Sequence, residues 1–474
     1  MTSRSAALSP AGESDWGWRW RDLLLGGLLF FWIYSLAPTF FPIQSKRVIT
    51  LVGLLVLAVL GIVFRRRLPM DRAVLQVVCI FLVTGSWVVM GSIRTGFETP
   101  TYLAAMVLTF GESFLGGLVV AAVLVRRTLD LDRVIRLFHL VILSQAILII
   151  ISFLSPEFRQ ITAEYIPARG NIHALDPIRV RGLSHSSGAH MAALQAMAIL
   201  MVAYLVPRTR SFRHQLFLLG STIPLILSIF FTGRTGFVML PFAVLMWSSV
   251  MFFRTRFRLA HLAAYLGLLL LGVGAVGGTL WWNSRPEANS ASSDQATALS
   301  FAYAAAERRL MTEFSGGPGQ TFLGSRTLHT LFREMWIIPR TDEAFLFGDP
   351  RKYLTVQSDL GVIRHLHSGG LIGMILVYTS VLATFLVISF RLRDRGTRIF
   401  IWIFFLWLAL LEFKEPMMIN HLFAGMYFVI FWFTFLVDRR RGDPRGVLPA
   451  APPVNAAPPA TSSLPVTAVV PATP

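Results

Sequence analysis

The chain has 474 residues, of which 54% are hydrophobic and 14% are charged, and its mean hydropathy is +0.62. This composition excludes an ordinary soluble globular domain and is typical of a polytopic membrane protein. The formal net charge is +18, but the excess is mostly arginine in short clusters between apolar runs, which indicates membrane topology and no nucleic-acid partner.

Apolar runs long enough to cross a bilayer recur along the chain. A hydrocarbon core about 30 Å thick needs roughly 20 apolar residues per helix. The sequence therefore predicts an all-α polytopic membrane protein with a transmembrane domain at residues 22–437. Its twelve expected helices are at residues 22–40, 47–64, 73–91, 101–125, 134–154, 188–206, 214–232, 236–253, 260–282, 365–390, 399–415 and 416–437.

Starting from the N-terminal segment 1–21, every second connection between these runs is rich in arginine. The bilayer side with the excess of Lys and Arg is the cytoplasmic one. The pattern therefore predicts that both termini are cytoplasmic and that residues 438–474, rich in Pro and Ala, form a disordered tail. The arginine clusters lie at residues 65–67, 126–127, 207–213, 254–258, 391–398 and 439–441.

Two long connections fall on the opposite, periplasmic side, at residues 155–187 and 283–364. The second is the large loop between the ninth and tenth expected helices. Within it, residues 321–340 carry apolar side chains at three- and four-residue spacings, which predicts an amphipathic helix on the membrane surface. Such a helix serves either as a lid or as a surface anchor.

Four arginines lie on the outer side, where the topology rule gives no reason for them. Arg179 and Arg181 precede the sixth run, Arg234 lies in the tight hairpin after the seventh, and Arg364 precedes the tenth. A guanidinium binds phosphate or pyrophosphate through two parallel donors without a metal. We therefore expect a binding site for a phosphorylated substrate; for each arginine singly, snorkelling to lipid headgroups is the alternative.

Charged residues also follow the eleventh run at an unusual depth. Only 13 apolar residues separate Arg398 from Glu412, which is about 20 Å of helix and shorter than the bilayer core. Glu412, Lys414 and Glu415 should therefore lie below the outer surface and bind substrate in a wet cavity or pair with one another. Glu112, in the middle of the fourth run, is expected to bond a neighbouring helix.

Three residues are candidates for proton transfer: Asp359, His365 and His367. A carboxylate or imidazole removes a hydroxyl proton near neutral pH when its surroundings tune it. Neither these histidines nor His185 and His190 have the spacing of zinc ligands, so no metal site is expected.

The "LDLD" stretch at residues 129–132 is similar to the Asp-x-Asp of nucleotide-sugar enzymes. It lies on the cytoplasmic side, however, next to Arg126 and Arg133. We expect it to be a solvated loop.

Four short outer-face stretches contain most of these residues: "RVRGLSHSSGAHMAAL", "FTGRTGF", "SDLGVIRHLHSGGLIG" and "LEFKEP". Together they resemble the O-antigen polymerase family, over roughly residues 165–437. The resemblance implies a bacterial inner-membrane enzyme that joins undecaprenyl-pyrophosphate-linked repeat units into O-antigen or a related polysaccharide, without a cofactor. It further implies that Arg181 and Arg234 hold the pyrophosphate and that Arg364 contacts the donor or positions Asp359.

Two alternatives stay open. An O-antigen ligase differs only in its acceptor, lipid A-core in place of a growing glycan, and usually has a histidine in the large loop, which His365 or His367 would match. A flippase or transporter for the same lipid belongs to another class and would show internal repeats and broken helices at the midplane. The expected partners are the lipid-linked donor, the glycan acceptor and the bilayer, with a chain-length regulator as a further candidate.

Overall fold

The computed structural model describes residues 20–41, 43–63, 71–97, 101–166, 180–184, 188–232, 334–353 and 355–442. Within these residues the regular elements are helices and there is no strand, so the expected all-α class is confirmed for this part of the chain. The expected helices at 236–253 and 260–282 lie outside it, as does most of the loop 283–364. Seven helices here are long and apolar enough to cross a membrane: Arg72–Arg94, Tyr102–Val125, Leu131–Leu154, Ala189–Arg208, Phe212–Ile229, Gly361–Arg391 and His421–Arg440.

Each expected apolar run within the described residues coincides with one or more helices. In chain order the elements are α1 (Trp20–Tyr34), α2 (Ser45–Val63), α3 (Arg72–Arg94), α4 (Thr101–Met106), the π-helical turn η1 (Val107–Glu112), α5 (Ser113–Val125), α6 (Leu131–Leu154), α7 (Pro156–Tyr165), α8 (Ala189–Leu205), η2 (Val206–Arg208), α9 (Phe212–Gly220), α10 (Thr222–Thr232), α15 (Asp342–Phe347), η6 (Pro350–Tyr353), α16 (Gly361–Arg391), α17 (Arg395–Glu412) and α18 (His421–Gly442).

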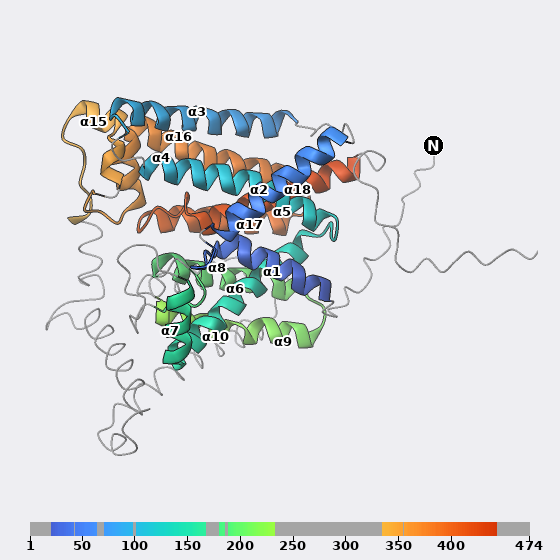
Figure 1. The fold of residues 1–474 in the computed structure, drawn as a ribbon. Coiled ribbons are helices and arrows are strands. Elements are labelled where there is room, and N and C mark those ends of the chain that lie inside the picture. The colour runs from blue at the N-terminus through green and yellow to red at the C-terminus, as the bar shows by residue number, and fades with distance from the viewer. Residues whose placement is uncertain are drawn as a thin grey trace, which may run out of the picture.

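The long helices form two groups that share α18 (Figure 1). In one group α3 packs on α16, and α18 packs on α5 and α16. In the other, α6, α8 and α10 pack on one another, and α18 also contacts α6 and α8. The side chains of α8 and α18 are almost all buried, as expected for helices that are apolar on every side.

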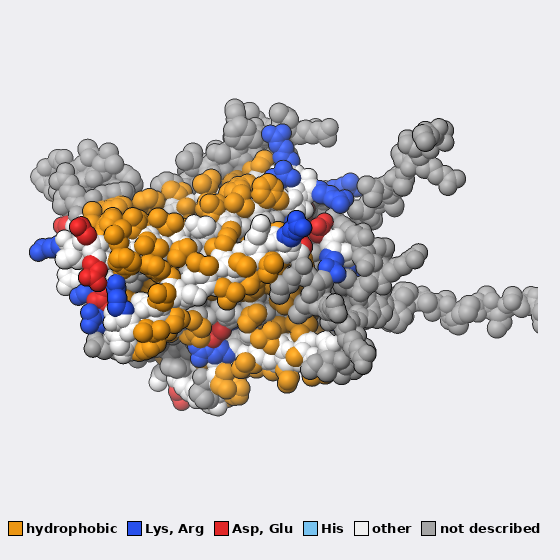
Figure 2. Space-filling model, turned by 90° about the horizontal axis from the view of Figure 1, so that it is seen from above, with side chains coloured by type: hydrophobic (Ala, Val, Ile, Leu, Met, Phe, Trp, Pro, Cys, Tyr) orange, Lys and Arg blue, Asp and Glu red, His pale blue; other side chains and the backbone are white. Residues whose placement is uncertain are grey.

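Hydrophobic side chains also cover the outside of the bundle. Figure 2 shows them over a broad band, with charged side chains gathered mostly towards the two ends. Leu51, Leu82 and Met90 are each more than half exposed. An apolar band between two charged rims is the distribution that a bilayer core requires.

Several helix starts are fixed by a polar cap next to the apolar run. The carboxylate of Asp71 accepts from the backbone N–H of Val74 at 2.8 Å at the start of α3. Asp394 accepts from the N–H of Thr397 at 2.7 Å at the start of α17. Such caps satisfy N–H groups that have no partner inside the helix. Because of its cap, α17 starts at Arg395, four residues before the expected run.

Two helices deviate from the expected continuous runs. Ser221 separates α9 from α10, where Pro224 removes one backbone donor from the first turn of α10. In α16, Gly370 has a φ of 68° and an added Cβ would collide with the backbone of Leu346. The indole N–H of Trp87 donates to the carbonyl of Gly369 at 2.9 Å at this kink, so a carbonyl next to the kink has a partner.

Connections that the arginine pattern assigns to one side do meet at one end of the bundle. Arg133 pairs with Asp22 at 2.6 Å, and Arg391 pairs with Asp71. These contacts join segments that are far apart in the sequence, as the alternation requires. We call this end the basic end; it comprises residues 20–22, 71–72, 126–133, 207–211, 391–398 and 439–440.

The other connections meet at the opposite end. The N–H of Thr39 donates to the carbonyl of Tyr165 at 2.8 Å, and Arg94 donates to the carbonyl of Gly348. We call this end the loop end; it comprises residues 35–41, 43–45, 94–97, 155–166, 180–184, 334–353, 355–361 and 412–421.

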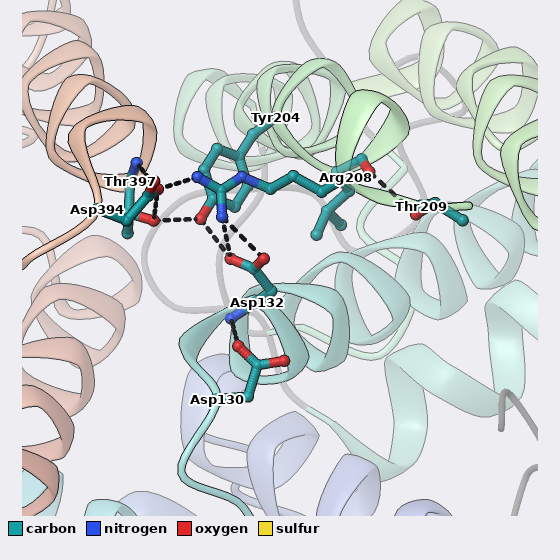
Figure 3. A network of polar contacts seen from close by, with 8 residues as sticks. Asp130, Asp132, Tyr204, Arg208, Thr209, Asp394 and Thr397 are labelled. Atoms are coloured by element: carbon teal, nitrogen blue, oxygen red, sulfur yellow. Dashed lines mark hydrogen bonds and ion pairs between the residues drawn. The ribbon is translucent and has the colours of Figure 1, made fainter. Parts of the chain in front are cut away.

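A polar network at the basic end involves the second aspartate of the "LDLD" stretch (Figure 3). Asp132 accepts from the guanidinium of Arg208 at 2.9 Å and from the hydroxyl of Tyr204. Arg208 also pairs with Asp394, and Tyr204 lies 2.8 Å from the hydroxyl of Thr397. The expected solvated loop is therefore wrong for Asp132, because this residue lies in the first turn of α6 and its bonded side chain is only 23% exposed.

Asp394 makes stability at the basic end depend on pH. Burial alone would raise its pKa, but hydrogen bonds from Thr397 and Arg208 outweigh this and lower the pKa to about 2. A carboxylate with a depressed folded-state pKa stabilises the fold above its unfolded-state pKa, and this stabilisation disappears as pH falls through the folded-state value.

We therefore expect the melting temperature in detergent to fall between about pH 4 and pH 2, and to fall less steeply in the Asp394→Asn variant. Asp342→Asn, an exposed carboxylate at the loop end, is the control. Identical pH profiles for wild type and Asp394→Asn would contradict the assignment.

Candidate functional site

A short irregular segment reaches into the bundle at the loop end. Residues 180–184 lie between α7 and α8, and Nε2 of Gln145 donates a 2.7 Å hydrogen bond to the carbonyl of Arg181. Gln145 lies nine residues before Leu154, the end of α6, so this contact is about 14 Å below that end. Irregular backbone at such depth is tolerated where it is enclosed by protein or lines a wet cavity.

The conformation of this segment depends on Gly182. Its φ is +56°, which is unfavourable for residues with a Cβ, and an added Cβ would lie 2.7 Å from Nε2 of Gln145. The N–H of Val180 donates to the carbonyl of Phe231 at 3.0 Å. Residues 180–184 are thus held between α6 and the end of α10.

The Arg181 side chain is buried, and its two terminal nitrogens have no partner in the described part of the chain. The residue is 4% exposed, and neither Nη1 nor Nη2 makes a hydrogen bond with any described residue. Arginine keeps its charge in proteins, and a buried charge without a partner is costly. A guanidinium in this state is stabilised by an anion, which makes its surroundings the strongest candidate for an anion-binding site in the described part of the chain.

Two glutamines add unsatisfied polar atoms to the same part of the bundle. The Oε1 atom of Gln145 and the Nε2 atom of Gln195 are buried and have no hydrogen-bond partner among the described residues. Thr232, at the end of α10, donates to Oε1 of Gln195 at 3.4 Å. Buried groups of this kind are normally satisfied by water or ligand. Sequence reasoning missed both glutamines, although each interrupts an apolar run.

The turn after α17 carries the charges that were expected below the surface. Glu412 is 2% exposed, and its Oε2 accepts from the N–H of Met418 at 2.9 Å. Its Oε1 lies 3.2 Å from Nε2 of His365 and accepts from the hydroxyl of Tyr378 at 3.4 Å. Glu412 therefore fixes the end of α17 against α16.

Lys414 and Arg364 share one carboxylate. Nζ of Lys414 lies 3.3 Å from Oδ2 of Asp359, and Nη2 of Arg364 lies 3.5 Å from Oδ1. Nε of Arg364 also donates to the carbonyl of Ser358 at 2.7 Å. Asp359 thus holds two cations next to each other at the loop end, and its own side chain is 47% exposed.

Glu415 contacts a third segment. Its Oε2 lies 3.1 Å from Nε2 of His190, in the first turn of α8, and both side chains are about one quarter exposed, at 23% and 26%. The three charged residues of residues 412–415 thus pair with α16, with the segment before it and with α8, not with one another. This short turn brings together segments that enter the site from different parts of the chain.

His365 itself is enclosed. Its side chain is 0% exposed, and its Nδ1 lies 3.3 Å from the hydroxyl of Tyr102. Tyr353 of η6 also faces the imidazole, with ring centroids 6.4 Å apart. Burial raises the pKa of the Tyr353 phenol, so the phenol is protonated at neutral pH. These contacts hold the imidazole of His365 inside the protein.

The remaining predicted site residues either make contacts other than those above or lie outside the described part. His367 bonds to the carbonyl of Ile337 through its Nε2 at 2.7 Å. Arg179 and Arg234 lie outside the described residues, and so does most of the expected amphipathic helix at 321–340.

A second charged group lies in the span formed by α4, η1 and α5. Glu112, the last residue of the π turn η1, pairs with Nε of Arg47 at 2.6 Å, as the expected bond to a neighbouring helix requires. Nζ of the buried Lys46 donates to the hydroxyl of Ser113 at 2.7 Å and to the carbonyl of His421 at 2.9 Å. A π turn next to charges within a span often marks a functional site.

No group of three or more His, Cys, Asp or Glu side chains in the described residues has the arrangement of a metal site. Comparison with models of known families, with curated proteins and with solved structures found no match. The candidate functional site therefore consists of residues 180–184, the turn at 412–415 and their partners.

Proposed function

We propose that the protein polymerises undecaprenyl-pyrophosphate-linked oligosaccharide repeat units into O-antigen or a related surface polysaccharide, at the loop end of the bundle. The observation that carries the proposal is the buried guanidinium of Arg181, in an irregular segment at membrane depth, whose Nη1 and Nη2 have no hydrogen-bond partner among the described residues. A lipid-linked pyrophosphate is an anion that its lipid tail confines to the bilayer surface. A buried cation at the loop end of the bundle suits its diphosphate.

The proposed chemistry is inverting glycosyl transfer. A hydroxyl of the acceptor attacks the anomeric carbon of the donor, and the bond to the pyrophosphate breaks. Arg181, with Arg179 and Arg234, which the sequence pattern assigns to the same side of the membrane, stabilises the charge that develops on the departing pyrophosphate. Arg364 and Lys414, held by Asp359, supply further positive charge. The permanent charges take the role that a divalent cation has in other phosphate sites, so the proposal requires no metal and no cofactor.

The proposed topology puts both termini in the cytoplasm of a bacterium, twelve helices in the inner membrane and the loop end in the periplasm. We expect a reporter enzyme active only in the periplasm to give signal when fused at Ser292 and none when fused after Arg441. The reverse pattern would put the Arg181 segment in the cytoplasm, away from the periplasmic glycan, and reject the proposal.

One set of observations favours a second candidate, a transporter for the same lipid. The π turn η1 interrupts a span, and its last residue, Glu112, pairs with Nε of Arg47 at 2.6 Å. Broken helices and charges at mid-membrane depth are features of transporters. A transporter would use the charges of this pair. A glycosyltransferase would instead use those of Arg181 and of the turn at 412–415.

A single reconstitution separates these functions. Purified protein in liposomes is incubated with a lipid-linked repeat unit, and the products are resolved on a gel. Polymerase activity gives a ladder of longer glycans, and lipid A-core added to the mixture stays unmodified. Glycan attached to the lipid A-core would identify a ligase. Movement of the lipid-linked unit between leaflets without lengthening would identify a transporter and reject the proposed function.

A further inference from the structure

His190 and Glu415 form a pair that none of the preceding roles uses. Nε2 of His190 lies 3.1 Å from Oε2 of Glu415. His190 is in the first turn of α8, six residues after the segment 180–184. Within the described part of the chain, the imidazole has no ion pair or hydrogen bond other than that with Glu415. A carboxylate at one ring nitrogen fixes the orientation and tautomer of an imidazole and leaves the other nitrogen as a proton acceptor.

The other candidate bases already have partners. Asp359 shares its two carboxylate oxygens between Lys414 and Arg364. His365 is fully enclosed, and His367 is bonded to a backbone carbonyl. A base must come within hydrogen-bond distance of the hydroxyl that it deprotonates. Of the titratable groups around the 412–415 turn, His190 combines a partly exposed imidazole, at 26%, with an orienting carboxylate.

We propose that His190 is the proton acceptor for the attacking hydroxyl and that Glu415 positions its imidazole; this inference rests on the proposed function. Glu415 directly follows Lys414, which contacts Asp359 at 3.3 Å. One turn therefore carries both a cation for the donor side and the carboxylate that orients the base. The ligand class is a sugar hydroxyl of a glycan acceptor.

The step balances without a further reactant. Nδ1 of the neutral imidazole takes the proton of the acceptor hydroxyl, and the oxygen forms the new bond to the anomeric carbon. The bond from that carbon to the pyrophosphate oxygen breaks, and its electron pair leaves with the pyrophosphate. The imidazolium formed is stabilised by the Glu415 carboxylate, and it returns its proton to solvent before the next turnover.

The test measures kcat and KM for the lipid-linked donor in reconstituted protein. We expect His190→Gln to lower kcat by about 100-fold or more, with KM for the donor unchanged, since general bases contribute about that much. Glu415→Gln should give a smaller loss of kcat with an unchanged donor KM, because the imidazole keeps its lone pair. Glu343→Gln, whose side chain is 76% exposed at the same end, is the control.

A rescue experiment separates a base from a structural residue. Adding imidazole to His190→Ala should restore part of the lost turnover, and adding it to an Arg181→Lys sample should restore none. Full activity of His190→Gln, or inactive His190→Ala that imidazole does not rescue, would overturn the inference while leaving the proposed function intact. No glycan lengthening by the wild-type protein would instead reject the proposed function, and the inference with it.

Discussion

Replacing Arg181 by lysine should reduce glycan lengthening by about 100-fold or more, because loss of a preorganised donor to a developing charge costs about two orders of magnitude in rate. Lysine retains the positive charge but not the planar pair of donors that binds a phosphate through two oxygens. The measurement is ladder formation by reconstituted protein, with membrane abundance determined in parallel. Arg340→Lys, an exposed arginine at the same end, is the control and should keep full activity.

Substitution of Arg181 should also change stability, and here the expected effect is a gain. In the absence of substrate, Arg181→Met should raise the free energy of unfolding by about 1–3 kcal/mol, because a buried donor without a partner costs about that much. The variant should therefore be inactive but melt at a higher temperature than the wild type. A lower melting temperature would mean that Arg181 stabilises the empty protein and is not kept for a ligand.

Binding provides the third readout for Arg181. Farnesyl pyrophosphate, a short soluble isoprenoid diphosphate, should raise the melting temperature of the wild type and leave that of Arg181→Met unchanged, since only a ligand bound to the folded state stabilises it. If inorganic pyrophosphate gave the same shift, the site would recognise the diphosphate alone. An equal shift in both proteins would place the anion elsewhere and remove the main support for the proposed function.

Within the described residues, the sequence predicted the helices well where a run of apolar residues decides the structure. The breaks were not predicted, because the expected runs at 214–232 and 365–390 continue through Ser221 and Pro224 and through Gly369 and Gly370, residues that also occur within unbroken helices. The environment of Asp132 was not predicted from the sequence either. Its local neighbours are charged loop residues, which favour exposure, whereas the hydroxyl of Tyr204 and the guanidinium of Arg208 approach it from another helix. Contacts between distant segments therefore decided the environment of Asp132.

The candidate site was predicted in part by asking which charges the membrane topology does not explain. That rule identified Arg181 and Glu412, and both are buried at 4% and 2% exposure. The rule does not show which residue each charge contacts, so it did not reveal that the 412–415 turn contacts His190. In the sequence, the neighbours of His190 are small or apolar residues. Only the fold brings Glu415 to it.

Replacing Asp359 by asparagine should raise the KM for the lipid-linked donor by about tenfold, or about 1.4 kcal/mol of binding, and change kcat much less. The carboxylate holds Lys414 and Arg364 at 3.3 and 3.5 Å. An asparagine side chain has one carbonyl oxygen and no charge, so it can retain one cation and must release the other. The measurement is initial rate of glycan lengthening against donor concentration, with Asp342→Asn as the control.

Stability distinguishes this role from a structural one. The Asp359 side chain is 47% exposed, and ion pairs of exposed groups contribute about 0–1 kcal/mol. The melting temperature of Asp359→Asn should therefore stay close to that of the wild type. A collapse of kcat with an unchanged KM would instead make Asp359 the base, because the amide keeps the shape of the side chain but cannot accept the proton. His190→Gln would then retain turnover, and the two variants together identify which residue takes the proton.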